Sequence, residues 1–268
     1  KDKIKGNIKF AFQPNEEDAG AEIMINEGIL ENPKVDAAIA IHLWSPIQVG
    51  KIGVAQGPIM ASSDYFNITI HGRGGHGGAP HETIDPILTA SSIMQQVQSI
   101  QSRNLDAINE PTVITFGSIK GGDFPIVIPE KAELAGSIRC LHPNLDKIKE
   151  LFERKIKGQC EADGTSYELS YKVGNRLLSN NSEMTELIKE TAKEVVGEEN
   201  LESNIAVMLG EDFAEFSLRL PSCLYFVGVA NAEKGTDYGH HHPKFNIDED
   251  ALSIGVEMHV KTALEYLK

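Results

Sequence analysis

The sequence predicts an α/β protein with a mostly parallel sheet, into which a ferredoxin-like β-α-β-β-α-β domain is inserted. Three observations support this prediction. Residues 1–60 follow the order strand, helix, buried strand, which is typical of a parallel sheet. A stretch of about 110 residues then follows the order of a split βαβ fold. After Asn175 the first pattern returns, so we expect one discontinuous domain, 1–60 and 176–268, and an inserted domain, 61–175.

The first segment of the outer domain contains three predicted elements. The run Ile8–Phe12 is typical of a strand. Apolar residues at helical spacing predict a helix over Gly20–Glu27, with Gly28 as its stop signal. Val35–Ile41 is a continuous apolar run, as expected for a strand that is buried on both faces. Together these elements form a βαβ unit.

The inserted domain contains strands with alternating apolar and polar residues and two helices with an apolar side. Asn144 precedes the second helix as a capping residue. The predicted elements, in order, are Tyr65–Ile70, Asp85–Ser102, Thr112–Ile119, Lys131–Leu141, the helix after Asn144, and Tyr167–Val173.

The last segment returns to the outer domain. Its closing helix carries Leu252, Val256, Val260 and Leu264 at helical spacing. The predicted elements are the helix Ser182–Val196, the short apolar strand Cys223–Val229 and the closing helix Asp250–Leu267.

Composition excludes several classes of partner. The chain has 25 basic and 39 acidic residues, a formal net charge of −14. Nucleic acids and anionic membranes bind basic surfaces, so we expect neither as a partner. No apolar run reaches the length of about 18 residues that a transmembrane helix needs. The three cysteines are widely spaced, and we expect reduced thiols in a cytoplasmic protein.

Candidate catalytic residues follow predicted strands. Glu16 and Glu17 come after the first strand, His42 ends the second, and His240-His241-His242 follows the Cys223–Val229 strand. Ligands of a parallel sheet bind beyond the carboxyl ends of its strands. Carboxylates and imidazoles suit a divalent metal, and one carboxylate of the pair can remain free as a general base. The pattern therefore indicates metal-assisted hydrolysis.

Each of these features also has a structural interpretation. An acidic pair is often a solvated helix start, and His42 could be a buried core residue. The histidine triple could be a polar loop. Glu211-Asp212 is typical of a helix start and is also a candidate to line the site. What favours the functional interpretation is that the acidic pair, His42 and the triple meet at one sheet edge.

Two candidates lie in the inserted domain. His76 stands in the run Gly74-Gly75-His76-Gly77-Gly78, where a flexible loop could bring an imidazole to a developing oxyanion. The glycine pattern lacks the helix and acidic residue of a dinucleotide site. Arg139 lies on a predicted strand, where it forms either a surface ion pair or a bidentate contact with a substrate carboxylate.

These motifs resemble, in the same order, those of a known family. It is the amidohydrolase branch of the co-catalytic metallopeptidases, which includes N-acyl-amino-acid amidohydrolase, hippurate hydrolase and the indole-acetyl-amino-acid hydrolases. The resemblance covers essentially the whole chain. The motifs that carry it are Phe12-Gln13-Pro14-Asn15-Glu16-Glu17, Ile41-His42-Leu43-Trp44, Gly72-Arg73-Gly74-Gly75-His76, Thr83-Ile84-Asp85-Pro86, Val127-Ile128-Pro129, Gly210-Glu211-Asp212-Phe213 and His241-His242-Pro243-Lys244-Phe245.

The resemblance implies a metal-dependent hydrolase of N-acyl amino acids that releases a carboxylate and an amino acid. In it, Glu16 matches the general base, and Glu17, His42 and His241 match metal ligands. The complete enzyme holds two divalent ions, and Zn, Mn, Co and Ni all suit such ligands. The outer domain is then catalytic, the inserted domain mediates dimerisation, and a homodimer is expected.

The resemblance also implies roles for residues of the inserted domain. His76 matches the histidine that contacts the substrate carbonyl, and Arg139 matches an arginine that holds the substrate carboxylate. Ile126 departs from the pattern because it stands where the family usually has a substrate-contacting asparagine. An apolar side chain cannot donate that hydrogen bond.

A second departure concerns an upstream segment. The family has a Cys-Gly-His-Asp-type segment before the two glutamates, and this chain has none there. We therefore expect the N-terminal part of the catalytic domain to be missing, and the chain alone to be metal-poor and inactive. Two alternatives stay open: a dipeptidase or carboxypeptidase of the same superfamily, and a non-catalytic dimerisation or binding fragment.

Overall fold

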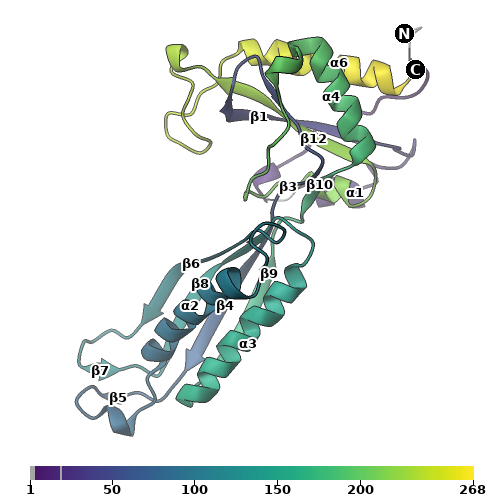
Figure 1. Ribbon diagram of the computed structural model, residues 1–268. Helices are drawn as coiled ribbons and strands as arrows, with labels where there is room; N and C mark the ends of the chain where they lie inside the picture. The colour runs from purple at the N-terminus through teal and green to yellow at the C-terminus, as the bar shows by residue number, and fades with distance from the viewer. Residues whose placement is uncertain (1–3, 19) are drawn as a thin grey trace. The chain divides into compact units, whose positions relative to one another are not determined.

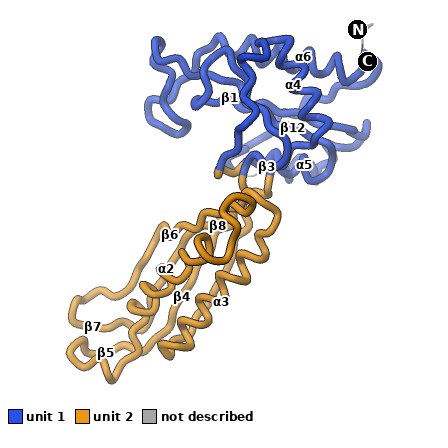
Figure 2. The backbone as a smooth tube through the Cα atoms, viewed as in Figure 1, with its two compact units in different colours: residues 1–60, 178–207, 211–268 blue, residues 61–177, 208–210 orange. Residues whose placement is uncertain are grey.

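A computed structural model describes residues 4–18 and 20–268. It divides the chain into two compact units (Figure 2). Unit 1 comprises residues 1–60, 178–207 and 211–268, and unit 2 comprises residues 61–177 and 208–210. Within the described residues, no helix is both long and apolar enough to span a membrane.

Unit 1 is built around a sheet with the strand order β1-β12-β2-β11, of which Figure 1 labels β1 and β12. The central pairing is parallel and joins β1 to β12, with Ala38 opposite Ser222 and His42 opposite Phe226. β12 pairs antiparallel with β2, and β2 pairs parallel with β11. The strands are β1 (Ala38–Gln48), β2 (Ile52–Gly53), β3 (Gly57–Met60), β10 (Leu178–Asn180), β11 (Leu201–Glu202) and β12 (Ser222–Ala230), with β3 and β10 forming a separate antiparallel pair.

Helices cover both faces of this sheet, which explains why β12 is apolar along nearly its whole length. Its odd-numbered residues, such as Tyr225, pack with residues of α4 and α6. Its even-numbered residues, such as Phe226, pack with Trp44 and residues of α1 and α5. The helices are α1 (Gly20–Asn26), α4 (Ser182–Val196), α5 (Ala214–Ser217) and α6 (Asp250–Tyr266), with the 3₁₀ turns η1 (Glu16–Asp18), η3 (Glu198–Asn200) and η4 (Ala232–Lys234). The predicted α/β class with a parallel sheet is confirmed.

Two expectations for unit 1 were wrong in detail. Residues 8–12 form no strand, because no described strand pairs with them, and Phe10 and Phe12 are exposed. β1 does not end at His42 but continues to Gln48, with an irregularity in register after Trp44. The closing helix is present as α6, where Leu252, Val256 and Val260 are exposed and the buried residues are Ala251, Gly255, Met258 and Thr262.

Unit 2 is an antiparallel sheet in the order β6-β8-β4-β9, with two helices on one face (Figure 1). Its chain order is β-α-β-β-α-β, so the predicted ferredoxin-like topology is confirmed. Alternation along β4 buries Phe66, Ile68 and Ile70 and leaves Tyr65 on the other face. The elements are β4 (Ser62–His71), β5 (Gly75–His76), η2 (Pro80–Glu82), α2 (Pro86–Arg103), β6 (Thr112–Gly121), β7 (Val127–Ile128), β8 (Lys131–Cys140), α3 (Leu145–Asp163) and β9 (Ser166–Val173).

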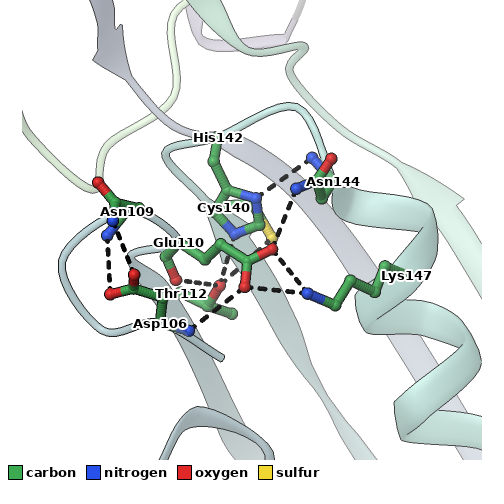
Figure 3. Close-up of polar contacts among 8 residues, drawn as sticks. All are labelled: Asp106, Asn109, Glu110, Thr112, Cys140, His142, Asn144 and Lys147. Carbon is green, nitrogen blue, oxygen red and sulfur yellow. Dashed lines mark hydrogen bonds and ion pairs between the residues drawn. The ribbon is translucent and has the colours of Figure 1, made fainter. Parts of the chain in front are cut away.

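A polar cluster joins the start of β6 to the start of α3 (Figure 3). His142 is buried, and its Nδ1 accepts the Asn144 N–H at 3.2 Å. Its Nε2 therefore carries the proton of the neutral ring and donates to Thr112 Oγ1 at 2.8 Å. Asn144 precedes α3 as expected but does not cap it with its side chain, which donates to Glu110 instead. Since every one of these groups has a hydrogen-bond partner, we interpret the cluster as a structural link between β6 and α3.

Candidate active site

Glu16 and Glu17 lie in a tight loop between residue 13 and the start of α1. The 3₁₀ turn η1 begins at Glu16, so the two adjacent side chains leave the backbone in different directions. Glu16 is half-buried, whereas Glu17 is exposed. Two neighbouring carboxylates of the same type therefore occupy different environments, as a division into base and ligand requires.

Glu16 lies beside two buried acids from the segment before α5. One carboxylate oxygen each of Glu16, Glu211 and Asp212 lies within 4.8 Å of the others. Burial, followed by the charges of Asp212 and Glu17, raises the pKa of Glu16 above its ordinary value. Burial, with the charges of Glu16 and Asp212, raises the pKa of Glu211 to about 8. The Glu211 carboxyl is thus largely protonated at neutral pH.

His42 lies within β1 and offers one nitrogen to a ligand. Its Nδ1–H donates to the Leu43 carbonyl at 2.7 Å, because a carbonyl oxygen can only accept, and this leaves the lone pair on Nε2. Burial is the main cause that lowers the pKa of His42, so the ring is neutral. Glu17 and His241 are both close enough to influence the pKa of this ring.

The histidine triple divides into residues with different surroundings. His240 Nε2–H donates to the Leu43 carbonyl at 2.9 Å, and its Nδ1 lies 3.3 Å from Ser45 Oγ, so both ring nitrogens are engaged. His241 has a positive φ of 61° and points its Nε2 to within 3.4 Å of Glu17 Oε1. The ring of the third histidine, His242, stacks on a tyrosine. Of the triple, His241 approaches Glu17, whereas the ring of His240 lies edge-on against the ring of His42 at 5.3 Å.

The donor set fits a divalent metal. Two ligand atoms bound at about 2.0–2.1 Å to one tetrahedral ion lie about 3.3–3.4 Å apart, which is the spacing of Glu17 and His241. A metal-binding histidine usually donates its other N–H to a carbonyl or carboxylate, as His42 does to Leu43. Among the described residues, however, the three donors that lie closest together are not this set but Glu16, Glu211 and Asp212. Glu17, His42 and His241 are neighbours in a looser arrangement.

His76 and Ile126, both in unit 2, lie together on a small antiparallel pair formed by β5 and β7. His76 is opposite Val127, and the Gly77 N–H donates to the Ile126 carbonyl at 2.8 Å. A Cβ on Gly77 would lie 3.0 Å from that oxygen, so glycine permits the close approach. The His76 Nδ1 accepts the Gly78 N–H at 3.0 Å, and Ile126 is 66% exposed.

Arg139 lies on β8, opposite Ser63 and Val113 on the neighbouring strands. Its side chain is half-buried and Nη1 donates to the Met208 carbonyl at 3.4 Å. The structure therefore gives Arg139 a backbone contact within unit 2, where the sequence offered either a surface ion pair or a carboxylate contact. The other nitrogens of its guanidinium can still bind a planar anion.

The prediction from sequence left Glu211 and Asp212 without a definite role. They are 5% and 1% exposed, and both face Glu16 across the tertiary fold. Burial of two adjacent acids cannot be read from a local pattern that also suits an exposed helix start. Their position directly after Gly210 in one of the quoted motifs was the available signal.

Comparison with known proteins places the chain in a family. Residues 1–265 match the model of Peptidase family M20/M25/M40. The chain belongs to this family. The resemblance inferred from the motifs is thereby confirmed, and with it the expectation of a hydrolase of the metallopeptidase type.

Individual relatives are similar to the chain over much of its length. Thermostable carboxypeptidase 2 of Saccharolobus solfataricus is 36% identical over 271 residues, covering 99% of this chain and 67% of that protein. N-acyl-L-amino acid amidohydrolase of Geobacillus stearothermophilus is 40% identical over 186 residues, covering 68% of this chain and 50% of that protein. The Bacillus subtilis YXEP protein, described as a dinuclear metal binding peptidase, superposes with a TM-score of 0.82 at 28% identity, covering 99% of this chain and 66% of that one. The chain thus spans about two thirds of the length of the first and the third of these proteins.

Proposed function

We propose that the protein hydrolyses the amide bond of N-acyl amino acids with the help of two divalent metal ions, releasing a carboxylate and a free amino acid. The observation that carries this proposal is the unequal pair of Glu16 and Glu17. Glu16 lies among acids and has a raised pKa, as suits a group that takes and returns a proton. Glu17 faces an imidazole instead. The name of the Geobacillus relative supports the substrate class.

In this mechanism Glu17, His42 and His241 hold metal. A bound divalent ion of this kind lowers the pKa of water and polarises a carbonyl group. Glu16 accepts the proton of the attacking water and later delivers it to the leaving amine, so that the proton count closes over one turnover. The Glu16 carboxyl group therefore performs both proton transfers.

Two residues of unit 2 complete the proposal. His76 stabilises the oxyanion that forms when the amide carbonyl is attacked, and Arg139 holds the substrate carboxylate. Unit 2 serves as a dimerisation domain and the protein is a homodimer, which sedimentation analysis tests directly. A cytoplasmic location stays a prediction, supported by the three free and buried cysteines.

The test compares Glu16→Gln with the unchanged protein, using the natural full-length chain loaded with zinc or manganese. We expect turnover of N-acetyl and N-benzoyl amino acids to fall by about 10²–10⁴-fold, the contribution of a general base, while metal content stays the same. Glu198→Gln is the matched control, because Glu198 also opens a 3₁₀ turn with a second glutamate and is exposed. Loss of metal in Glu16→Gln would show that the roles of Glu16 and Glu17 are exchanged.

A carboxypeptidase is the second candidate, because the Saccharolobus relative carries that name. The two activities differ in substrate and not in the residues that perform the chemistry. Parallel assays on N-acyl amino acids and on dipeptides separate them. An absence of both activities in the full-length protein, with metal bound, would refute a hydrolase and favour a binding role.

A further inference from the structure

We propose that Asp212 is a positioning residue that fixes the loop carrying Glu16 and Glu17 by binding both of its ends. The inference rests on the proposed function only in taking Glu16 as the general base and Glu17 as a metal ligand. It goes beyond that function because it assigns a role to a residue that neither binds metal nor transfers a proton in the mechanism above.

The contacts of Asp212 identify this role. Its Oδ1 accepts a hydrogen bond from Gln13 Nε2, just before the loop. Its Oδ2 accepts the Ala21 N–H at 2.8 Å, just after the loop. The two oxygens of one carboxylate thus hold the two flanks of residues 14–20. The Ala21 N–H is one of the donors at a helix start that lack a partner within the helix, so the contact also satisfies α1.

The burial and the contacts of Asp212 suit a positioning role. Both of its oxygens already accept from the protein, and the side chain is 1% exposed. Glu17 and His241, by contrast, are exposed and face each other. A buried carboxylate that accepts a hydrogen bond at each oxygen is fixed by the protein, and through these contacts it fixes the flanks of the loop.

Contacts between the described residues of the loop also hold its two ends together. Asn15 has a φ of 50°, and its carbonyl accepts the Gly20 N–H at 3.2 Å. A Cβ on Gly20 would lie 1.7 Å from the Pro14 carbonyl oxygen, so the loop closes on itself at that glycine. Because the Asn15 and Gly20 contacts close this short loop, displacement of either end is expected to move Glu16, and catalytic groups lose efficiency when misplaced by about 1 Å.

The first experiment uses Asp212→Asn in the full-length chain. Asparagine keeps the shape but removes the charge and one accepting oxygen, so the contact with Gln13 is kept only if the Gln13 amide turns over, and both contacts lose the strength that a charged acceptor gives. We expect amide hydrogen exchange of residues 13–21 in the metal-free protein to accelerate at least about tenfold. Zinc affinity, measured by competition with a chromogenic chelator, should fall about 10–100-fold, the range seen when groups that orient metal ligands are lost.

Asp64→Asn is the matched control. Asp64 is also an aspartate with 1% exposure, but it pairs with Lys149 in unit 2. This substitution should lower stability without changing exchange in residues 13–21 or zinc affinity. Equal effects of both substitutions on the loop would mean that general destabilisation, and not loss of the flanking contacts, is the cause.

Gln13→Ala removes the same contact from the other side and keeps the proposal testable if Asp212→Asn does not fold. The double variant completes a cycle. If Gln13 and Asp212 act through one contact, the second substitution adds little to the first in loop exchange and zinc affinity. Additive effects would overturn the proposed coupling.

The outcomes separate this inference from the proposed function. If the unchanged protein binds zinc and hydrolyses N-acyl amino acids, yet Asp212→Asn and Gln13→Ala match it in loop exchange and affinity, the positioning role is wrong and the function stands. If the unchanged protein does neither, the function is wrong, and exchange of residues 13–21 alone decides whether Asp212 holds the loop.

Discussion

The buried carboxyl of Glu211 makes a sharp prediction for the pH dependence of stability. In the unfolded chain this group ionises with its ordinary pKa of 4.5, whereas in the folded protein burial and two neighbouring acids raise the pKa to about 8. Between these values the folded protein keeps a proton that the unfolded chain has released. Stability therefore falls as pH rises through this range.

The size of the effect follows from the interval between the two pKa values. Each pH unit across which only the folded state holds the proton costs about 1.4 kcal/mol. From pH 4.5 to pH 8 the loss of unfolding free energy approaches about 5 kcal/mol. Glu211→Gln keeps the shape of the side chain and removes the titration. The unchanged protein should therefore lose stability relative to this variant as pH rises, with the difference growing by about 1.4 kcal/mol per unit.

The assay is urea unfolding in the presence of a chelator at several pH values between 5 and 8. The single tryptophan, Trp44, lies in unit 1 with Glu211, so its fluorescence reports that unit. The quantity to compare is the difference in unfolding free energy between the unchanged protein and Glu211→Gln at each pH. Histidines such as His42, whose pKa is lowered by burial, make both proteins more stable as pH rises, and this contribution cancels in the difference. Glu198→Gln, at an exposed position, is the control. Parallel curves for Glu211→Gln and the unchanged protein would refute the reasoning.

Three further predictions concern unit 2. Phe152→Ala should cost about 3–5 kcal/mol, since its fully buried ring packs 4.7 Å from that of Phe66, and hydrogen exchange of α3 measures the loss. Burial lowers the pKa of His142, so unit 2 should lose stability as pH falls below about 6.5, where the ring of the unfolded chain takes up a proton. A protonated ring cannot accept the hydrogen bond from the Asn144 N–H. Proton NMR titration of the ring measures this pKa, and a value at or above 6.5 would contradict the prediction. Ile126→Asn should lower KM about tenfold, because the asparagine amide adds a hydrogen bond to the substrate worth about 1–1.5 kcal/mol, and steady-state kinetics measures this change. The free energy of unfolding should stay nearly unchanged, because position 126 is exposed, and urea unfolding measures it.

The sequence predicted most elements of the fold because local patterns determine them. Phe66, Ile68 and Ile70 alternate on β4, and all three point to the core as the period of a strand requires. The chain order of unit 2 follows the split βαβ pattern, and its sheet order agrees. For the candidate site, the sequence identified Glu17 and His241, whose side chains the fold brings within 3.4 Å.

Features that depend on distant partners could not be predicted. Residues 8–12 have the composition of a strand, yet a strand needs a neighbour to satisfy its backbone, and no described segment provides one. The spacing of Leu252 and Val256 on α6 is helical, but spacing alone does not say which face is buried. Glu211 and Asp212 are far from Glu16 in the sequence, so only tertiary packing reveals the acidic cluster.

The interrupted course of unit 1 has a consequence for folding during synthesis. Unit 2 is almost entirely one continuous stretch, residues 61–177, so its core can form once that stretch has been made. β1, in contrast, pairs with β12, so Ala38 has no strand partner until Ser222 has been synthesised. At about 5–20 residues per second, β1 remains without its partner for roughly 10–40 seconds after it leaves the ribosome. During this time its unpaired edge can pair with strands of other chains, so aggregation of newly made chains should begin at β1. Lower expression reduces the concentration of such chains and should therefore reduce this aggregation.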